Sequence, residues 1–234
     1  MLAIWKRELQ AYFRTPIAYV FMGIFLLISG IMVAYFLASG SGNITSIMSS
    51  LSFVFLIVVP ILTMRLFSEE RRNKTDQMLI TAPITVTQLV LGKYLAAMTM
   101  FALTLACTLV YPFIITVLGV EIVSETFSSY LGFFLLGAAN ISIGLFISSI
   151  CENQVTSAIA TLGALMVTQY VSMFTTALPG WLAKVVNMIA ISDRYVEFGA
   201  SIIYISPIVY FITVVALMLF MTTRSIEKRR WSES

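Results

Sequence analysis

Long apolar runs without charged residues dominate the pattern along this chain. A helix that crosses the hydrocarbon core of a bilayer needs about 20 apolar residues. Six segments reach or approach that length, and they are Ile17–Ala38, Ile47–Met64, Tyr94–Leu118, Ser128–Ile150, Val155–Leu178 and Ile203–Met221. The pattern predicts an all-α integral membrane protein, with six transmembrane helices in a single transmembrane domain over residues 1–234.

Composition agrees with this prediction. Hydrophobic residues make up 59% of the chain, charged residues make up 11%, and the mean hydropathy is +0.97. Soluble domains have about 45–50% apolar and about 25% charged residues. A soluble protein would need six buried helices with no polar face, which leaves nothing to form its surface. The first run is also longer than the 7–15 apolar residues of a signal peptide, and no small-residue cleavage site follows it, so it is read as a retained span.

Residues 1–15 predict an amphipathic helix before the first span. Its apolar positions recur at helical spacing and are Leu2, Trp5, Leu9, Tyr12 and Phe13. A basic helix with aromatic residues on one face suits the plane of the membrane interface. Pro16 is expected to end this helix and allow a turn into the first span. The alternative is a plain extension of that span.

Basic residues fall almost entirely on one side of the predicted spans. The N-terminus, the loop after span 2, the link after span 4 and the C-terminus carry 12 of the 14, namely Lys6, Arg7, Arg14, Arg65, Arg71, Arg72, Lys74, Lys93, Arg224, Lys228, Arg229 and Arg230. Only Lys184 and Arg194 lie on the other side. Because positive residues collect on the cytoplasmic side of short loops, both termini are expected in the cytoplasm.

The charged segment between spans 2 and 3 predicts a short helix. Thr75 can cap a helix that runs from Asp76 towards Thr81, and Pro83 stops it. Thr85-x-x-Gln88 is a capping box that starts the helix leading into span 3. A short exposed helix with an apolar edge is a docking element for a partner. The alternative is an ordinary positively charged loop.

Two polar residues lie within spans, and a long connection precedes the last span. Asn140 and Gln169 could line a pathway or hydrogen-bond between packed helices. Residues 179–202 are semi-apolar and too short for a pair of spans, which suits short interfacial or re-entrant helices on the outer side.

The sequence lacks several kinds of chemistry. It contains no GxxxxGK[ST] phosphate loop, no HExxH, CxxC or GxSxG motif, and no histidine. Its two cysteines, Cys107 and Cys151, fit no zinc spacing and are not expected to form a disulfide. No acidic residue lies in mid-span, where ion-driven carriers hold one. We therefore expect no catalytic residue, metal or cofactor in this chain, which leaves a transporter subunit powered by another chain, an autonomous channel or carrier, or a structural membrane protein.

The stretch from Pro60 to Lys93 carries a family resemblance. Its successive motifs are Met64-Arg65-Leu66-Phe67-Ser68-Glu69-Glu70-Arg71-Arg72, then Thr75 with Met78-Leu79-Ile80-Thr81-Ala82-Pro83, then Leu91-Gly92-Lys93. Together with the C-terminal part from Arg194 to Trp231, this resembles the permease subunits of ABC-2 type transporters, in particular the short GldF-like and NosY-like branch. Lys74 and Gln77 depart from the family pattern, which has Gly and Glu at these positions.

The resemblance implies a permease without ATPase activity of its own, in a prokaryotic cytoplasmic membrane. A separate ATP-binding subunit would hold ATP and magnesium, and a second permease chain, identical or not, would complete the complex. The implied coupling interface comprises Glu69, Glu70, Arg71, Arg72, Lys74, Thr75, Asp76, Gln77, Met78, Leu79 and Ile80, with an outer helical hairpin before span 6. Export of a substrate is the expected activity. The alternative is force transmission to an extracytoplasmic partner.

Overall fold

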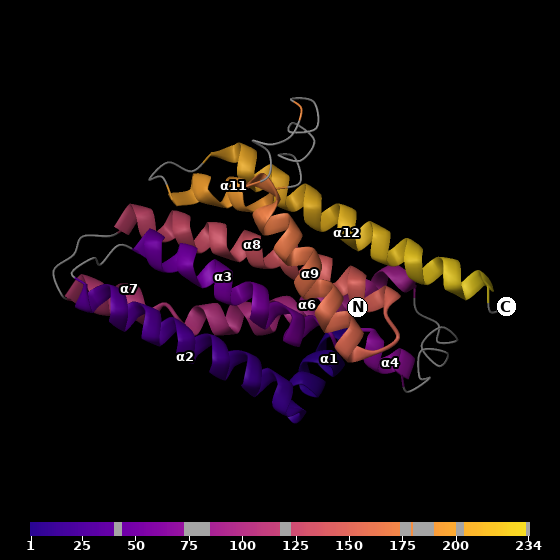
Figure 1. The fold of residues 1–234 in the computed structure, drawn as a ribbon. Coiled ribbons are helices and arrows are strands. Elements are labelled where there is room, and N and C mark those ends of the chain that lie inside the picture. The colour runs from indigo at the N-terminus through magenta and orange to yellow at the C-terminus, as the bar shows by residue number, and fades with distance from the viewer. Residues whose placement is uncertain are drawn as a thin grey trace.

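The computed structural model describes residues 1–39, 44–72, 85–117, 123–173, 179, 190–199 and 204–232. All regular structure within these residues is helical (Figure 1). The elements are α1 (Leu2–Arg14), α2 (Pro16–Ala38), α3 (Ile44–Thr63), α4 (Ser68–Arg72), α6 (Val86–Cys107), α7 (Val110–Val117), α8 (Val123–Ile150), α9 (Gln154–Tyr170), α11 (Ile191–Val196), the 3₁₀ helix η2 (Glu197–Gly199) and α12 (Ile205–Ser232).

The six predicted spans are confirmed as helices long and apolar enough to cross a membrane. Within the described residues these are Pro16–Ala38, Ile44–Arg72, Val86–Val117, Thr126–Ile150, Gln154–Met173 and Ile205–Lys228. The helices of spans 2 and 4, α3 and α8, form the centre of the bundle, whereas α2, α9 and α12 expose large apolar side chains such as Leu27, Ile159 and Phe220. Contiguous apolar surface of this kind calls for a lipid environment.

The N-terminal helix is separate from the first span, as Pro16 predicts. Thr15 has extended backbone angles of φ −111° and ψ 152° between α1 and α2, and Pro16 is the first residue of α2. Proline is tolerated there because the first N–H groups of a helix have no partner within it. The alternative of a plain extension of span 1 is therefore wrong.

Span 3 bends close to Pro112, as expected of a proline within a span, which frees a carbonyl and kinks the helix. α6 ends at Cys107 and α7 begins at Val110. Pro112 has no N–H to donate to the carbonyl of Thr108, four residues earlier. That carbonyl instead accepts hydrogen bonds from the Tyr130 hydroxyl at 2.8 Å and from the backbone N–H of Tyr111 at 2.9 Å. Tyr130 of α8 thus stabilises the bend.

Aromatic rings and small residues build the core between the central helices. Phe55 of α3 packs on Phe101 of α6 and Phe133 of α8, with ring centroids 4.7 and 5.3 Å away. A Cβ atom added at Gly137 would lie 2.2 Å from the Phe101 ring, and one at Gly144 would lie 2.4 Å from the Thr63 hydroxyl. These glycines let α8 approach α6 and α3 closely, as small residues do in membrane bundles.

The two ends of the bundle differ in their charges. α1, α4 and the C-terminal end of α12 lie towards one end, and α7 with the N-terminal ends of α3 and α8 lies at the other (Figure 1). α11 and η2 fall within the predicted outer connection, and its residues 180–189 and 200–202 lie outside the described ones. The first end therefore gathers the basic residues of α1, α4 and α12.

Candidate functional site

The second span breaks at a four-residue turn, and this turn is the centre of the candidate site. α3 ends at Thr63 and α4 begins at Ser68. The backbone closes the turn with hydrogen bonds from the N–H of Met64 to the Pro60 carbonyl at 2.9 Å and from the N–H of Leu66 to the Thr63 carbonyl at 3.1 Å. We call residues 64–67 the α3–α4 junction.

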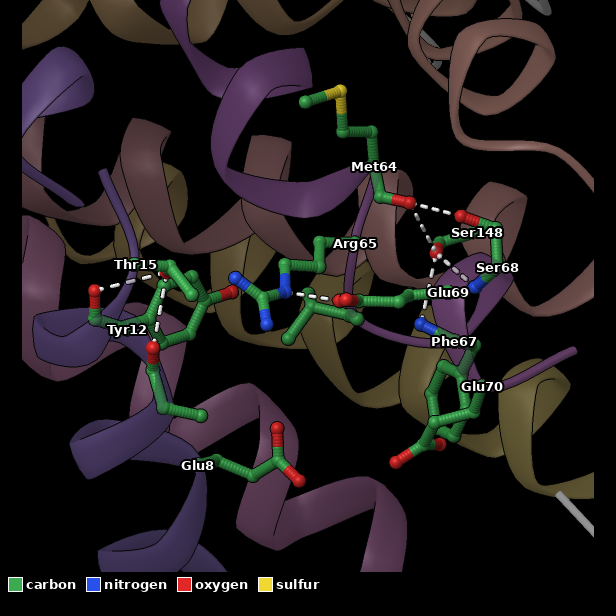
Figure 2. A network of polar contacts seen from close by, with 12 residues as sticks. Glu8, Tyr12, Thr15, Met64, Arg65, Phe67, Ser68, Glu69, Glu70 and Ser148 are labelled. Atoms are coloured by element: carbon green, nitrogen blue, oxygen red, sulfur yellow. Dashed lines mark hydrogen bonds and ion pairs between the residues drawn. The ribbon is translucent and has the colours of Figure 1, made fainter. Parts of the chain in front are cut away.

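Two side chains from other helices hydrogen-bond to backbone groups at the end of α3 and the start of α4, and Figure 2 shows the contacts of one of them, Ser148. The hydroxyl of Tyr12 in α1 donates to the carbonyl of Leu62 at 2.9 Å, and burial raises the pKa of this phenol, so it stays protonated. The hydroxyl of Ser148 in α8 accepts from the N–H groups of Phe67 and Ser68 at 3.1 and 3.3 Å. The backbone groups at helix ends have no partner within their own helix. Here the side chains of Tyr12 in α1 and Ser148 in α8 serve as those partners.

Lys93 of α6 is a fully buried charge beside the junction. Its side chain is 1% exposed. Its ammonium donates to the carbonyl of Leu66 at 2.6 Å and to Glu70 at 2.8 Å, and it lies 3.4 Å from Glu8. It also lies 5.1 Å from the centre of the Phe67 ring. Lys93 therefore joins α6 to α1, to the junction and to α4.

Opposite charges surround this lysine. Arg7 lies 2.8 Å from Glu8 and 3.4 Å from Glu70, and Arg65 pairs with Glu69 one turn away. Burial opposes ionisation of Glu8, yet Lys93 and Arg7 outweigh burial and hold the pKa of this carboxyl below its usual range. Each buried charge thus has a partner, as charges away from water require.

A cavity of about 350 Å³ opens among these side chains. Three bases, three acids and three further residues line it, and they are Arg7, Lys93, Arg65, Glu8, Glu69, Glu70, Ala11, Tyr12 and Leu66. We call it the charged pocket.

Packing holds α1 against α6 beside this pocket. The indole N–H of Trp5 donates to the Thr99 hydroxyl at 3.0 Å. A Cβ atom at Gly92 would lie 2.8 Å from a side-chain carbon of Ile4, so the absence of a side chain at position 92 admits Ile4. The glycine next to Lys93 therefore lets α1 come close enough for Glu8 to reach the lysine.

The predicted coupling residues divide into four groups. Glu69 and Glu70 line the charged pocket, and Arg71 donates to the carbonyl of Ile150 and, at 3.0 Å, to Glu152 in the α8–α9 turn. Arg72 is exposed. Lys74, Thr75, Asp76, Gln77, Met78, Leu79 and Ile80 lie outside the described residues, as does the predicted helix from Asp76 to Thr81.

The other predicted positions have mixed outcomes. The capping box before span 3 is present in its first half, because the Thr85 hydroxyl accepts from the N–H of Gln88 at 3.3 Å. Asn140 is buried in α8, and its Nδ2 is one of the buried polar atoms without a hydrogen-bond partner among the described residues. Gln169 is half-buried near the end of α9. Neither polar residue takes part in the charge network, and both roles considered for them stay predictions.

The sequence did not predict Arg7, Glu8, Tyr12, Arg65, Lys93 and Ser148 as site residues. Lys93 had a signal, because a lone lysine directly precedes the apolar run of span 3, but it was used only as a topological charge and as part of the motif Leu91-Gly92-Lys93. Ser148 had none, since it lies among small polar residues inside a span.

Comparison with known families gives a match over most of the chain. The profile of the ABC-2 family transporter proteins matches residues 35–226, which include α4, α6, α8 and the junction. No match was found among curated proteins. The GldF-like and NosY-like branch stays a prediction. With its six apolar helices and this family match, the chain is a multi-pass membrane protein that belongs to the ABC-2 transporter family as a permease component.

Proposed function

We propose that this permease is driven by a separate ATPase subunit, which docks on the charged segment after α4, and that it exports its substrate. The observation that carries the proposal is the binding of α4 to three other helices. α4 leads directly into the predicted coupling helix, and it is joined to α1 and α6 through Lys93 and to α8 through Ser148 and Arg71. A displacement of α4 would therefore move these helices with it.

The energetics favour motion as a unit. Removing one partner of a buried ion pair costs about 3–5 kcal/mol. The charge network around Lys93 would lose such contacts if α4 moved alone. Packed interfaces also shift between discrete arrangements instead of deforming continuously. ATP-driven closure of two ATPase subunits would thus act on the bundle through the α3–α4 junction.

Orientation and assembly follow from the same proposal. The basic residues of α1, α4 and the end of α12 are assigned to the cytoplasmic side, which places both termini there. The membrane is then the prokaryotic cytoplasmic membrane, and a second permease chain completes the complex. Uniformly apolar spans favour an amphipathic cargo over a multiply charged one.

Co-purification from the native host tests the ATPase partner. The tagged chain is purified in mild detergent and the proteins bound to it are identified. An ATP-binding protein should accompany the wild type and should be lost when Met78 and Leu79 are both changed to Asp. The matched control exchanges the two side chains as Met78→Leu and Leu79→Met, which keeps apolar volume at the same positions. If no ATPase accompanies the intact wild type, the proposal fails.

Thiol labelling tests the orientation. After Cys107→Ala, Cys151 in the α8–α9 turn should react with a membrane-impermeant maleimide in inside-out vesicles and not in right-side-out ones. Ser39→Cys at the other end, in a chain without Cys107 and Cys151, should give the reverse pattern. Labelling of Cys151 from the outside would overturn the assigned topology.

Transport itself is tested in inside-out vesicles that carry the complex. ATP-dependent accumulation of a fluorescent amphiphile supports export. ATP hydrolysis without accumulation of any amphiphile tested would favour force transmission to an extracytoplasmic partner.

A further inference from the structure

The charged pocket lies beside the ends of the apolar runs of three spans. Pro16 starts the first span, Met64 precedes Arg65 at the end of the second, and Tyr94 follows Lys93 at the start of the apolar run of the third. Charges that flank spans lie in the head-group layer of the bilayer. The apolar side chains of Leu2 and Phe13 in the adjoining α1 are also exposed, at 78% and 39%. We therefore expect the pocket to open in the layer occupied by lipid head groups.

The pocket holds equal numbers of positive and negative side chains. An anion alone would meet three carboxylates, and a cation alone would meet three bases. A ligand that carries both charges avoids either repulsion. The volume of about 350 Å³ corresponds to roughly ten water molecules, which is enough for a small head group.

Three side chains in the pocket are open to further hydrogen bonds. Among the described residues, Arg65 uses only its Nε atom, in the contact with Glu69, which leaves the two Nη atoms as donors. Arg7 keeps 57% of its side chain exposed. The side chain of Glu69 is 30% exposed, against 14% for Glu8 and 17% for Glu70, both of which contact Lys93. Glu69 is therefore the carboxylate most open to a ligand.

We propose that the charged pocket binds the phosphoethanolamine head group of a membrane lipid. Arg65 and Arg7 donate to its phosphate, and Glu69 accepts from its primary ammonium. Guanidinium groups suit phosphate because their planar donors match its oxygens. A primary ammonium has three N–H donors, whereas the choline head group has none, so the carboxylate selects between the two lipids. The bound lipid would bridge α1 and the α3–α4 junction. This site does not depend on the ATPase partner, and its test does not use one.

A head-group methylation series on the wild-type chain tests the proposal. The delipidated protein in detergent is mixed with equal amounts of phosphatidylethanolamine, its N,N-dimethyl derivative and phosphatidylcholine, and bound lipid is counted by native mass spectrometry. The three lipids have the same phosphate group and differ in the number of N–H donors on the head-group nitrogen. A charge-assisted hydrogen bond is worth about 1.5–3 kcal/mol, so phosphatidylethanolamine should exceed phosphatidylcholine about tenfold or more. Equal binding of the three overturns the proposal.

Variants then locate the site. Glu69→Gln should remove the preference for phosphatidylethanolamine and keep binding of the phosphate. Arg65→Gln should reduce binding of both phosphatidylethanolamine and phosphatidylcholine, because the two lipids share the phosphate. The matched controls are Arg224→Gln and Glu227→Gln, which alter an exposed ion pair on α12 and should change nothing. A preference that survives both pocket substitutions would place the lipid elsewhere and overturn the proposal.

Competition distinguishes a lipid from a soluble ligand. Glycerophosphoethanolamine carries the same head group without acyl chains, and it should not displace the bound lipid at comparable concentration. Displacement at that concentration would mean that the pocket takes this head group from solution, and the lipid assignment would be wrong.

Discussion

Replacing Lys93 by Met should be strongly destabilising. Met keeps an unbranched chain of similar length but has no charge and no donor. The change leaves Glu8 and Glu70, whose side chains are 14% and 17% exposed, without their ammonium partner, and it leaves the Leu66 carbonyl without its donor at 2.6 Å. Breaking a buried pair in this way costs about 3–5 kcal/mol. The free energy of unfolding of a protein is about 5–15 kcal/mol in total, so the variant should lose a large share of its stability.

Unfolding of the purified chain in mixed micelles, followed by tryptophan fluorescence while a denaturing detergent is titrated in, measures this loss. The double variant Lys93→Met, Glu70→Gln neutralises one of the two carboxylates, and the other, Glu8, keeps Arg7 at 2.8 Å. The double variant should therefore cost less than the single one, about 1–3 kcal/mol, mainly for the lost donor to Leu66. Arg224→Met is the surface control, because Arg224 is 66% exposed and such pairs contribute about 0–1 kcal/mol. Two results would refute the buried ion pair. One is a loss of less than about 1 kcal/mol of unfolding free energy in Lys93→Met, and the other is a double variant as unstable as Lys93→Met.

Three further changes probe packing, the junction and pH. Gly137→Ala should cost about 1–3 kcal/mol in the same unfolding assay, because its Cβ would lie 2.2 Å from an aromatic carbon of Phe101. Gly163→Ala has open space around it and should change the free energy of unfolding by no more than about 0.5 kcal/mol. Tyr12→Phe should cost about 1–3 kcal/mol, because it leaves the buried carbonyl of Leu62 without its donor. An unchanged midpoint of the unfolding transition would contradict that hydrogen bond. The pKa of Glu8 lies below its ordinary value of 4.5, so the stability that its charge contributes is present above that pH and is lost as pH falls through the lowered pKa. Below pH 4.5, Glu8→Gln should show a weaker pH dependence of the unfolding free energy than the wild type, and equal dependence would contradict the assignment.

Local features of the sequence determined the membrane architecture. Six apolar runs predicted six spans because the thickness of the bilayer sets a length that no soluble helix needs to meet. The break before Pro16 and the cap at Thr85 were also predictable, since each depends on the residue itself and its nearest neighbours along the chain. The bend in span 3 was only half predictable. Pro112 indicated a kink, but the Tyr130 hydroxyl that binds the freed carbonyl comes from another helix.

The tertiary structure alone decided the charge network. Lys93 meets Glu8 and the Leu66 carbonyl, and Ser148 meets the N–H of Phe67, although these partners lie far apart along the chain. In the sequence, Lys93 is one more positive residue on the basic side, and nothing marks it as buried. Its role depends on the rotation and closeness of α1, α4 and α6, which packing sets through contacts such as Gly92 against Ile4. Hydropathy and capping signals act over one or two helical turns, whereas a buried charge is stabilised only by partners that the fold brings together.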